Sequence, residues 1–185
     1  MDDDRDENES EPRRDRDVGR GIRDMVSGLV ARCQEKRTRR EVYWDMLYTA
    51  VETLAANGGA VWEPVSGMPS QLKCAMGCGS QLNEELDGAL RRDPVEPFLA
   101  HVAMHGTTIV APPGEGGECS DGSNPTDDLW LFTPIGVARS AMPLAVLHVV
   151  QRSGTPGTTQ QGYARFMRQL CEIALDGLKR TVEAE

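Results

Sequence analysis

The most distinctive hydrophobic pattern lies near the end of the chain, between Asp128 and Gly154. Two almost wholly apolar stretches are joined there by a short polar turn. A strand that is apolar on both faces lies in the middle of a sheet that is covered on both sides. The segment therefore predicts two adjacent strands. An amphipathic helix is expected next, from Thr158 to about Val182, and its apolar stripe is Tyr163, Phe166, Met167, Leu170, Ile173, Ala174 and Leu178.

Two more stripes with helical spacing precede this segment. The first consists of Ile22, Met25, Val26, Leu29, Val30 and Cys33, and the second of Tyr43, Met46, Leu47, Ala50, Val51 and Leu54. Thr38, within a basic segment, suits the N-cap of the second stripe, and Asn57-Gly58-Gly59 is expected to end it. The pattern fits either two helices or one long bent helix.

The middle of the chain reads as a hairpin, a helix, a short strand and a long loop. The hairpin strands are expected at Ala60–Val65 and Gln71–Met76. A helix is expected from Asn83 to His105, and Pro94 and Pro97 are expected to break it, so that Pro94–His105 forms a separate helix. A short strand, Thr107–Ala111, and a long loop, Pro112–Asp127, follow. Consecutive hairpins imply an antiparallel sheet with helices on its faces. The predicted fold class is therefore α+β.

Composition excludes several classes of protein. The 185 residues carry a formal charge of −9, which argues against a nucleic-acid partner. No apolar run is long enough to insert in a membrane, and the charged N-terminus is unlike a signal peptide, so a cytoplasmic location is expected. Five scattered cysteines fit reduced thiols. Residues 1–17 lack large apolar side chains, and we expect them to be a disordered charged tail ahead of an amphipathic helix at 18–37.

Three segments carry a family resemblance. They are GGAVWEPV (Gly58 to Val65), FLAHVAMHGTTIVAPP (Phe98 to Pro113), and NPTDDLWLFTPIG followed by MPLAVLHVVQRSG near the end. In this order they resemble the first strand, the helix and strand before the binding loop, and the last two strands of a GAF domain. The resemblance covers residues 38 to 180, and the domain is expected at 38–182. It is similar to the GAF-like N-terminal region of some bacterial proteins with an HlyD-like membrane-fusion adaptor part, and this sequence holds no such part.

The resemblance implies a central antiparallel sheet of five to six strands, with helices on its faces and the N- and C-terminal helices packed together. It also implies a cytoplasmic sensory or regulatory module without catalysis. No cyclic-nucleotide motif and no bilin-binding Cys-His pair is present, so the ligand and any cofactor stay unknown. Cys119 lies where free methionine-R-sulfoxide reductases, which are GAF-fold enzymes, carry cysteines, although its context GGECSDG differs from theirs. A thiol-based GAF-fold reductase, a thiol oxidoreductase, is therefore kept as a further alternative.

The resemblance places a small-molecule pocket between the sheet and the loop Pro112–Asp127. Its expected lining is Phe98, Val102, Cys119, Trp130, Phe132 and His148. Strand alternation puts His148 on one face with Leu144, Val146 and Val150. A histidine at this position either contacts a bound ligand or is a core residue with a hydrogen-bond partner, and the second is the commoner case. The alternative to a ligand is a structural or dimerisation module whose pocket is filled by Trp62, Trp130 and methionines.

A metal site has one candidate set, Cys74, Cys78, His101 and His105. The histidines are four residues apart on one helical face, which suits a metal, but four groups have to converge and the sequence does not show that they do. We therefore expect no stoichiometric metal. The terminal helices, with stripes larger than one sheet face needs, are expected to pair two copies as a homodimer. The output protein that would receive a signal is unknown.

Overall fold

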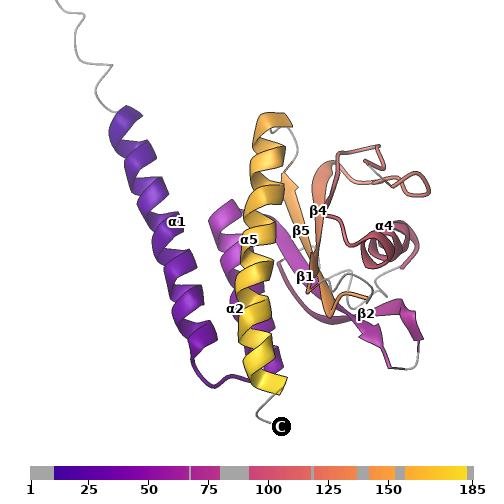
Figure 1. Cartoon of the computed structure of the whole chain (residues 1–185). Coiled ribbons are helices and arrows are strands. Elements are labelled where there is room, and N and C mark those ends of the chain that lie inside the picture. Colours follow the sequence, from indigo (N-terminus) through magenta and orange to yellow (C-terminus); the bar gives the residue numbers. More distant parts are fainter. Residues whose placement is uncertain are drawn as a thin grey trace, which may run out of the picture.

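The computed structural model describes residues 11–66, 68–79, 92–117, 119–136, 142–152 and 157–182. Within these ranges the chain forms an α+β domain (Figure 1). Its helices and strands are α1 (Glu11–Gln34), α2 (Arg39–Leu54), β1 (Gly58–Val65), β2 (Met68–Gly79), α4 (Arg92–His105), β3 (Ile109–Ala111), β4 (Asp128–Ile135), β5 (Ala145–Arg152) and α5 (Gly157–Val182). The predicted α+β class and the predicted order of elements are confirmed.

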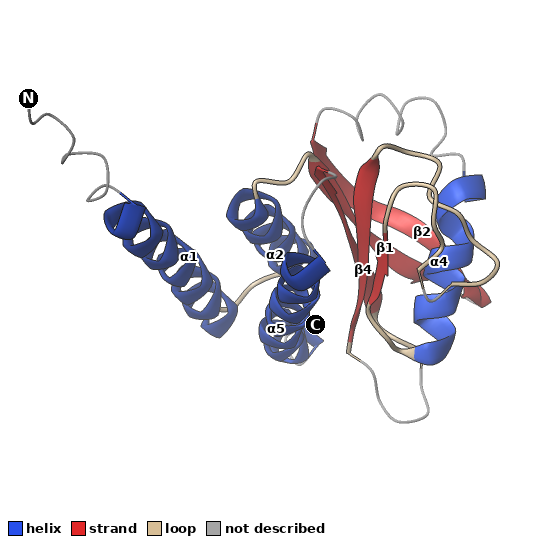
Figure 2. Cartoon of the chain, turned by 90° about the horizontal axis from the view of Figure 1, so that it is seen from above, coloured by secondary structure: helices blue, strands red, loops and turns tan. Residues whose placement is uncertain are grey.

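The strands form one five-stranded antiparallel sheet in the order β2-β1-β5-β4-β3. Strand β5 is the central strand, and it is buried from Ala145 to Gln151. Figure 2 shows the layers: α2 and α5 cover one face of the sheet, α1 lies outside them, and α4 covers the other face. The apolar stretch that dominates the sequence therefore occupies the centre of the sheet.

Strand alternation divides the interior into two cores. Ala145, Leu147 and Val149 of β5 point to the helices α2 and α5 and belong to the helical core. Val146 and Val150 point to α4 and belong to the aromatic core, which also contains Trp62, Phe98, Trp130 and Phe132. The predicted apolar stripe of α5 packs in the helical core, where Met167, Leu170, Ala174 and Leu178 are buried.

The N-terminal region consists of two helices rather than one bent helix. Thr38 caps α2, and a capping box with Glu41 completes the cap, as the sequence predicted. The turn is held by Asp45, which lies 3.2 Å from the guanidinium of Arg32 and 4.0 Å from that of Arg37. Helix α1 contacts both α2 and α5, so the predicted contact between N- and C-terminal helices is present.

Two predicted boundaries are wrong. Helix α1 begins at Glu11, so residues 11–17, which were expected in the disordered tail, are helical. Pro12 is compatible with the first turn of a helix, and the arginines Arg13, Arg14 and Arg16 are good helix formers. Helix α2 ends at Leu54, because Ala55 takes a left-handed conformation with φ of 48°. Gly58 and Gly59, expected to stop the helix, are strand residues instead.

Gly59 shows why a glycine is needed in β1. A Cβ atom there would lie 2.7 Å from the carbonyl oxygen of His148 and 2.9 Å from Leu47 Cδ1. The absence of a side chain lets α2 approach the sheet closely over β1 and β5.

The helix predicted from Asn83 is described from Arg92 onward, and residues 83–91 lie outside the described residues. Within the described part of the chain, no helix is both long and apolar enough to cross a membrane.

Gln151 connects the sheet to both covering helices. Its buried side-chain amide donates to the carbonyl of Leu54, at the end of α2, at 2.7 Å, and to the hydroxyl of Tyr163 in α5 at 3.3 Å. A buried carbonyl that loses its donor retains the cost of leaving water. Gln151 therefore fixes the ends of two helices to the central strand.

Replacing Gln151 by Leu should lower the free energy of unfolding by about 1 to 3 kcal/mol, because the Leu54 carbonyl loses its donor. Chemical denaturation measures this change. Gln169→Leu is the matched control, since Gln169 is exposed on α5 and should change stability by less than about 0.5 kcal/mol. Equal effects of the two substitutions would show that Gln151 does not hold the helices.

Candidate functional site

The sheet face beneath α4 is lined by aromatic rings. Strands β4 and β5 pair Phe132 with His148, and Trp130 with Val150, so these side chains point to the same face. Strand β1 places Ala60 beside His148 and Trp62 beside Val146, which brings the Trp62 indole onto this face as well. Helix α4 then covers the rings with Phe98. Sheet register therefore assembles the aromatic core from four separate segments.

Three of the rings form a column. Phe98 and Phe132 are stacked with centroids 5.3 Å apart and an interplanar angle of 2°. Phe132 and His148 are stacked at 4.2 Å and 11°. Trp130 stands edge-on to all three rings, at 5.7 Å from Phe98, 6.1 Å from Phe132 and 5.7 Å from His148. Such ring pairs each contribute about 0.5 to 1.5 kcal/mol beyond the area they bury.

His148 is the polar ring in this column. Its side chain is 2% exposed, and neither Nδ1 nor Nε2 has a hydrogen-bond partner among the described residues. Burial lowers the pKa of His148 to about 3, so the ring is neutral at physiological pH. Trp62 Nε1, in the same aromatic core, is likewise buried and without a partner. Two polar groups on one sheet face are thus left unsatisfied, which folded proteins usually avoid.

The loop from Pro112 to Asp127 lies beside this core and is organised by Asn124. The Asn124 side chain is fully buried and donates to the carbonyls of Ala111, at 2.9 Å, and Asp128, at 2.7 Å. Its oxygen accepts from the backbone N–H and the hydroxyl of Thr126. The backbone N–H of Asn124 donates to the backbone carbonyl of Glu115 across the loop. The predicted loop is therefore held by buried hydrogen bonds.

Cys119 and Gly122 bring the loop against α4. Cys119 is 3% exposed and belongs to the aromatic core. A Cβ atom on Gly122 would lie 2.9 Å from the ring of Phe98 and 3.2 Å from Cys119 Sγ. The loop backbone therefore sits directly on the Phe98 ring. Together α4 and the loop close the aromatic face from solvent.

All six residues of the predicted pocket come together in this region. Phe98, Val102, Cys119, Trp130, Phe132 and His148 are each less than 5% exposed. They form a closed cluster rather than an open pocket, because the rings stack on one another and fill the space. Trp62, expected to fill the pocket in the ligand-free alternative, lies in this cluster. Its indole nitrogen has no partner among the described residues, a feature that hydrophobic patterning does not predict.

The four residues of the metal alternative are not brought together. An extra residue in β2, Ala75, shifts the register between Val61 and Trp62. Cys74 therefore packs in the aromatic core and Cys78 against the helical core, on opposite faces of the sheet. His101 and His105 are neighbours on α4, with ring centroids 4.3 Å apart. Among the described residues, no three His, Cys, Asp or Glu side chains are grouped as a metal site.

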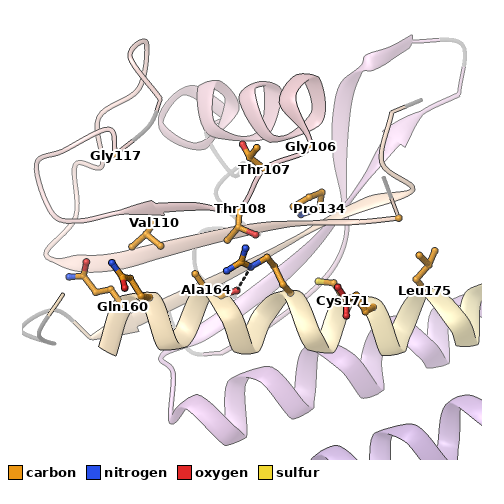
Figure 3. A pocket seen from close by; sticks show the side chains of 14 residues that line it. Gly106, Thr107, Thr108, Val110, Gly117, Pro134, Gln160, Ala164, Cys171 and Leu175 are labelled. Carbon is orange, nitrogen blue, oxygen red and sulfur yellow. Dashed lines mark hydrogen bonds between the residues drawn. The ribbon is translucent and has the colours of Figure 1, made fainter. Parts of the chain in front are cut away.

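A second hollow lies on the other side of the sheet edge, between α5 and the segment from Gly106 to Val110 (Figure 3). It is an open groove of about 1040 Å³. Figure 3 shows Thr108 and Val110 facing Gln160 and Ala164 across it, and the dashed line is the 3.3 Å bond from Arg168 Nε to the Ala164 carbonyl. The sequence did not predict this groove, because its lining alternates small and polar residues from several elements.

The groove is the weaker candidate of the two. Its charged side chains, Arg168 and Glu172, are exposed, and burial raises the pKa of its Cys171 thiol, which therefore stays protonated. The aromatic core instead combines full burial with unpartnered ring nitrogens. The aromatic core is therefore the stronger candidate site.

No family model and no curated protein matches the chain. Solved structures do. The GAF domain of A. aeolicus nlh2, in an inactive state, superposes with a TM-score of 0.64 at 12% identity, covering 88% of this chain and 98% of that one. The GAF domain of a putative sensor histidine kinase from Pseudomonas syringae pv. tomato gives 0.59 at 13% identity, covering 94% and 96%.

An enzyme is similar in the same way. Free methionine-R-sulfoxide reductase from Neisseria meningitidis, in complex with its substrate, gives a TM-score of 0.60 at 11% identity, covering 89% of this chain and 92% of that chain. At these identities the likeness shows the fold, and the chain has the GAF fold that the sequence predicted. The likeness to proteins with a membrane-fusion adaptor part stays a prediction.

Replacing Asn124 by Ala should release the loop from the sheet edge, because two backbone carbonyls lose their buried donor. The expected loss of unfolding free energy is about 1 to 3 kcal/mol. Cys119 should then react faster with an alkylating reagent, which peptide mass spectrometry follows residue by residue. Ser123→Ala, an exposed neighbour, is the control. Unchanged alkylation of Cys119 in the Asn124 variant would show that Asn124 does not keep the loop closed.

His148 should make stability fall with acid. The unfolded imidazole titrates near its ordinary value of 6.5 and the folded one near 3, so between these pH values the unfolded chain binds the extra proton. The free energy of unfolding should therefore decrease as pH falls from about 6.5 to about 3, by up to about 1.4 kcal/mol per pH unit from this residue.

The contribution of His148 is isolated by subtracting the pH profile of His148→Phe, which keeps a stacked ring and removes the titration. Urea denaturation between pH 7 and about pH 4 gives both profiles, and the free energy of unfolding of wild type minus that of His148→Phe should fall as pH falls. A difference that is constant with pH would mean that the folded and unfolded imidazoles titrate alike and that the His148 ring is solvated.

Proposed function

We propose that the chain is a sensory or regulatory module that binds a small uncharged molecule at the aromatic core and has no catalytic role. The observation that carries this proposal is His148, a buried ring on the face beneath α4 whose two nitrogens have no hydrogen-bond partner in the part of the chain that the structure describes. An unsatisfied buried polar group costs about 1 to 3 kcal/mol, and a ligand that supplies the missing hydrogen bond recovers that energy.

The chemistry of the core defines the ligand class. Trp62 Nε1 offers a donor, and neutral His148 offers one donor and one acceptor. The surrounding rings are apolar, so a formal charge on the ligand would be buried without a partner. A flat, uncharged molecule with hydrogen-bonding atoms at its edge fits both requirements, because it stacks on the Phe132 and Phe98 rings while its edge meets Trp62 and His148.

Entry requires α4 and the loop to separate from the sheet. The column of rings fills the closed face, so a ligand would bind an open state and shift the population toward it. The apparent affinity of the chain for the ligand is reduced in proportion to the fraction of molecules in the open state. Movement of α4 and the loop is then the structural change that an output protein reads. The structural likeness to the GAF domain of a putative sensor histidine kinase supports a signalling role.

Two other functions have specific observations behind them. The close stacking of Phe98, Phe132 and His148 favours a ligand-free structural module, in which these rings are simply core. The likeness to a methionine sulfoxide reductase favours thiol chemistry. Burial raises the pKa of Cys74 and Cys78, so these thiols are protonated and poorly nucleophilic at neutral pH. The five free cysteines fit a reducing cytoplasm.

A thermal-shift screen of uncharged and charged metabolites tests the proposal. An uncharged planar compound at about 100 times its Kd should raise the melting temperature by about 5 to 10 °C. The shift should be lost in His148→Phe and in Trp62→Phe, which keep the rings and remove the polar atoms. Replacing exposed His105 by Phe is the control and should leave the shift unchanged.

The other outcomes separate the three functions. Shifts from no compound would contradict the proposal and favour the structural module. Turnover of methionine sulfoxide that disappears on replacing Cys119 with Ser would favour the thiol enzyme. A shift that persists in both His148→Phe and Trp62→Phe would place the ligand elsewhere, and the groove at α5 would be examined by Thr108 and Gln160 variants.

A further inference from the structure

Helix α2 carries an exposed aromatic ridge. The chain has three Trp, three Tyr and three Phe, all within the described residues, and only Trp44, at 48%, and Tyr48, at 51%, are exposed. They are one helical turn apart on the exposed side of α2. An exposed aromatic pair of this kind is typical of an interaction surface. We propose that this ridge binds the same ridge of a second copy of the chain, with the two α2 helices antiparallel.

The charges that flank the aromatic pair identify the partner. Arg40 lies one turn before Trp44, and Glu52 lies one turn after Tyr48, so the ridge reads Arg, Trp, Tyr, Glu at four-residue spacing. Both charged side chains are exposed, and neither forms an ion pair with another described residue. When two such ridges run antiparallel about residue 46, Arg40 faces Glu52 of the other copy, and Trp44 faces its Tyr48.

This arrangement has the symmetry of a common dimer. Each contact occurs twice, because a two-fold axis makes residue i of one copy meet residue j of the other and the reverse. Residues four apart form the ridges that interlock when two helices cross at about −50°. A parallel arrangement would instead place Arg40 against Arg40 and Glu52 against Glu52. The order of charges along α2 therefore selects the antiparallel pair.

The surface beside the ridge has room for the partner's side chains. A hollow of about 490 Å³ lies next to Trp44, and its far wall is the edge strand β2 at Ala75, Met76 and Gly77. These β2 residues are partly exposed. An aromatic ring from the second copy entering this hollow would bury Trp44 and cover the edge strand, which protects that edge from pairing with a strand of another chain.

Part of the terminal helices, which the sequence suggested as the dimer surface, is buried within the chain, while Val30 of α1 is 36% exposed. On α5, Met167, Leu170 and Leu178 are buried in the helical core, and on α1 Leu29 and Cys33 are buried there too. The outer side of α2 is where aromatic side chains remain exposed. The proposal does not depend on ligand binding, since the ridge and the aromatic core lie on opposite sides of the sheet.

The test is the mass of the protein in solution, measured by sedimentation equilibrium up to about 1 mM protein. Wild type should reach twice the 20.2 kDa of the chain and dissociate on dilution. Arg40→Glu and Glu52→Arg should each weaken the dimer, by about tenfold in Kd, because each places two pairs of like charges together. The double variant R40E/E52R should restore wild-type affinity, since both ion pairs re-form in reverse.

Two controls accompany the charge variants. Glu96→Arg makes the same charge change on α4, on the other face of the sheet, and should leave the Kd unchanged. Trp44→Ala should raise the Kd by at least about a hundredfold, as removal of a central aromatic anchor does. Circular dichroism confirms folding of each variant, and Arg40→Glu is compatible with the helix because it places an acid in the first turn of α2.

The proposal is overturned by a wild-type chain that stays monomeric throughout the concentration range, which would leave the ridge to a different protein. It is overturned equally by single charge variants that dimerise like wild type, or by a double variant that fails to recover. The last result would show that the two copies do not pair Arg40 with Glu52.

Discussion

Strand β5 has to be covered on both faces, and the rest of the fold follows from that requirement. A strand whose side chains are apolar on both sides is stable only in the middle of a sheet between two layers. β1 and β4 flank it, α2 and α5 cover one face, and α4 with the long loop covers the other. Gly59 and Gln151 fix the helices at close range, one by the absence of a side chain and one by a buried hydrogen bond.

The two faces are not equivalent. The helical core is packed with aliphatic side chains between the sheet and two long helices. The aromatic core lies under a shorter helix and a loop, and it contains buried nitrogens that have no partner among the residues the structure describes. The cost of leaving the Trp62 and His148 nitrogens unsatisfied lowers the stability of the closed state on the aromatic face. A binding module needs a separable layer of this kind, with the rest of the domain remaining rigid.

The fold could be predicted from the sequence because hydrophobic periodicity fixes which strands and helices form and which side they bury. The alternation in β5 placed His148 on the correct face, and Thr38 was recognisable as a cap. The closure of the site was not predictable. It depends on how rings stack across β4, β5 and α4, and on the bulge at Ala75 that sends Cys74 and Cys78 to opposite faces. Such contacts join residues far apart in the chain, and one sequence carries no signal for them.

Native-state hydrogen exchange tests most directly whether α4 and the loop form a separable layer. The account predicts that the amides of Val146 to Val150 exchange only through global unfolding. Amides in α4 and those of Cys119 and Asn124 should exchange through a smaller opening, with a free energy several kcal/mol lower. If the α4 and loop amides instead share the opening free energy of β5, the aromatic face does not open separately, and the central claim is contradicted.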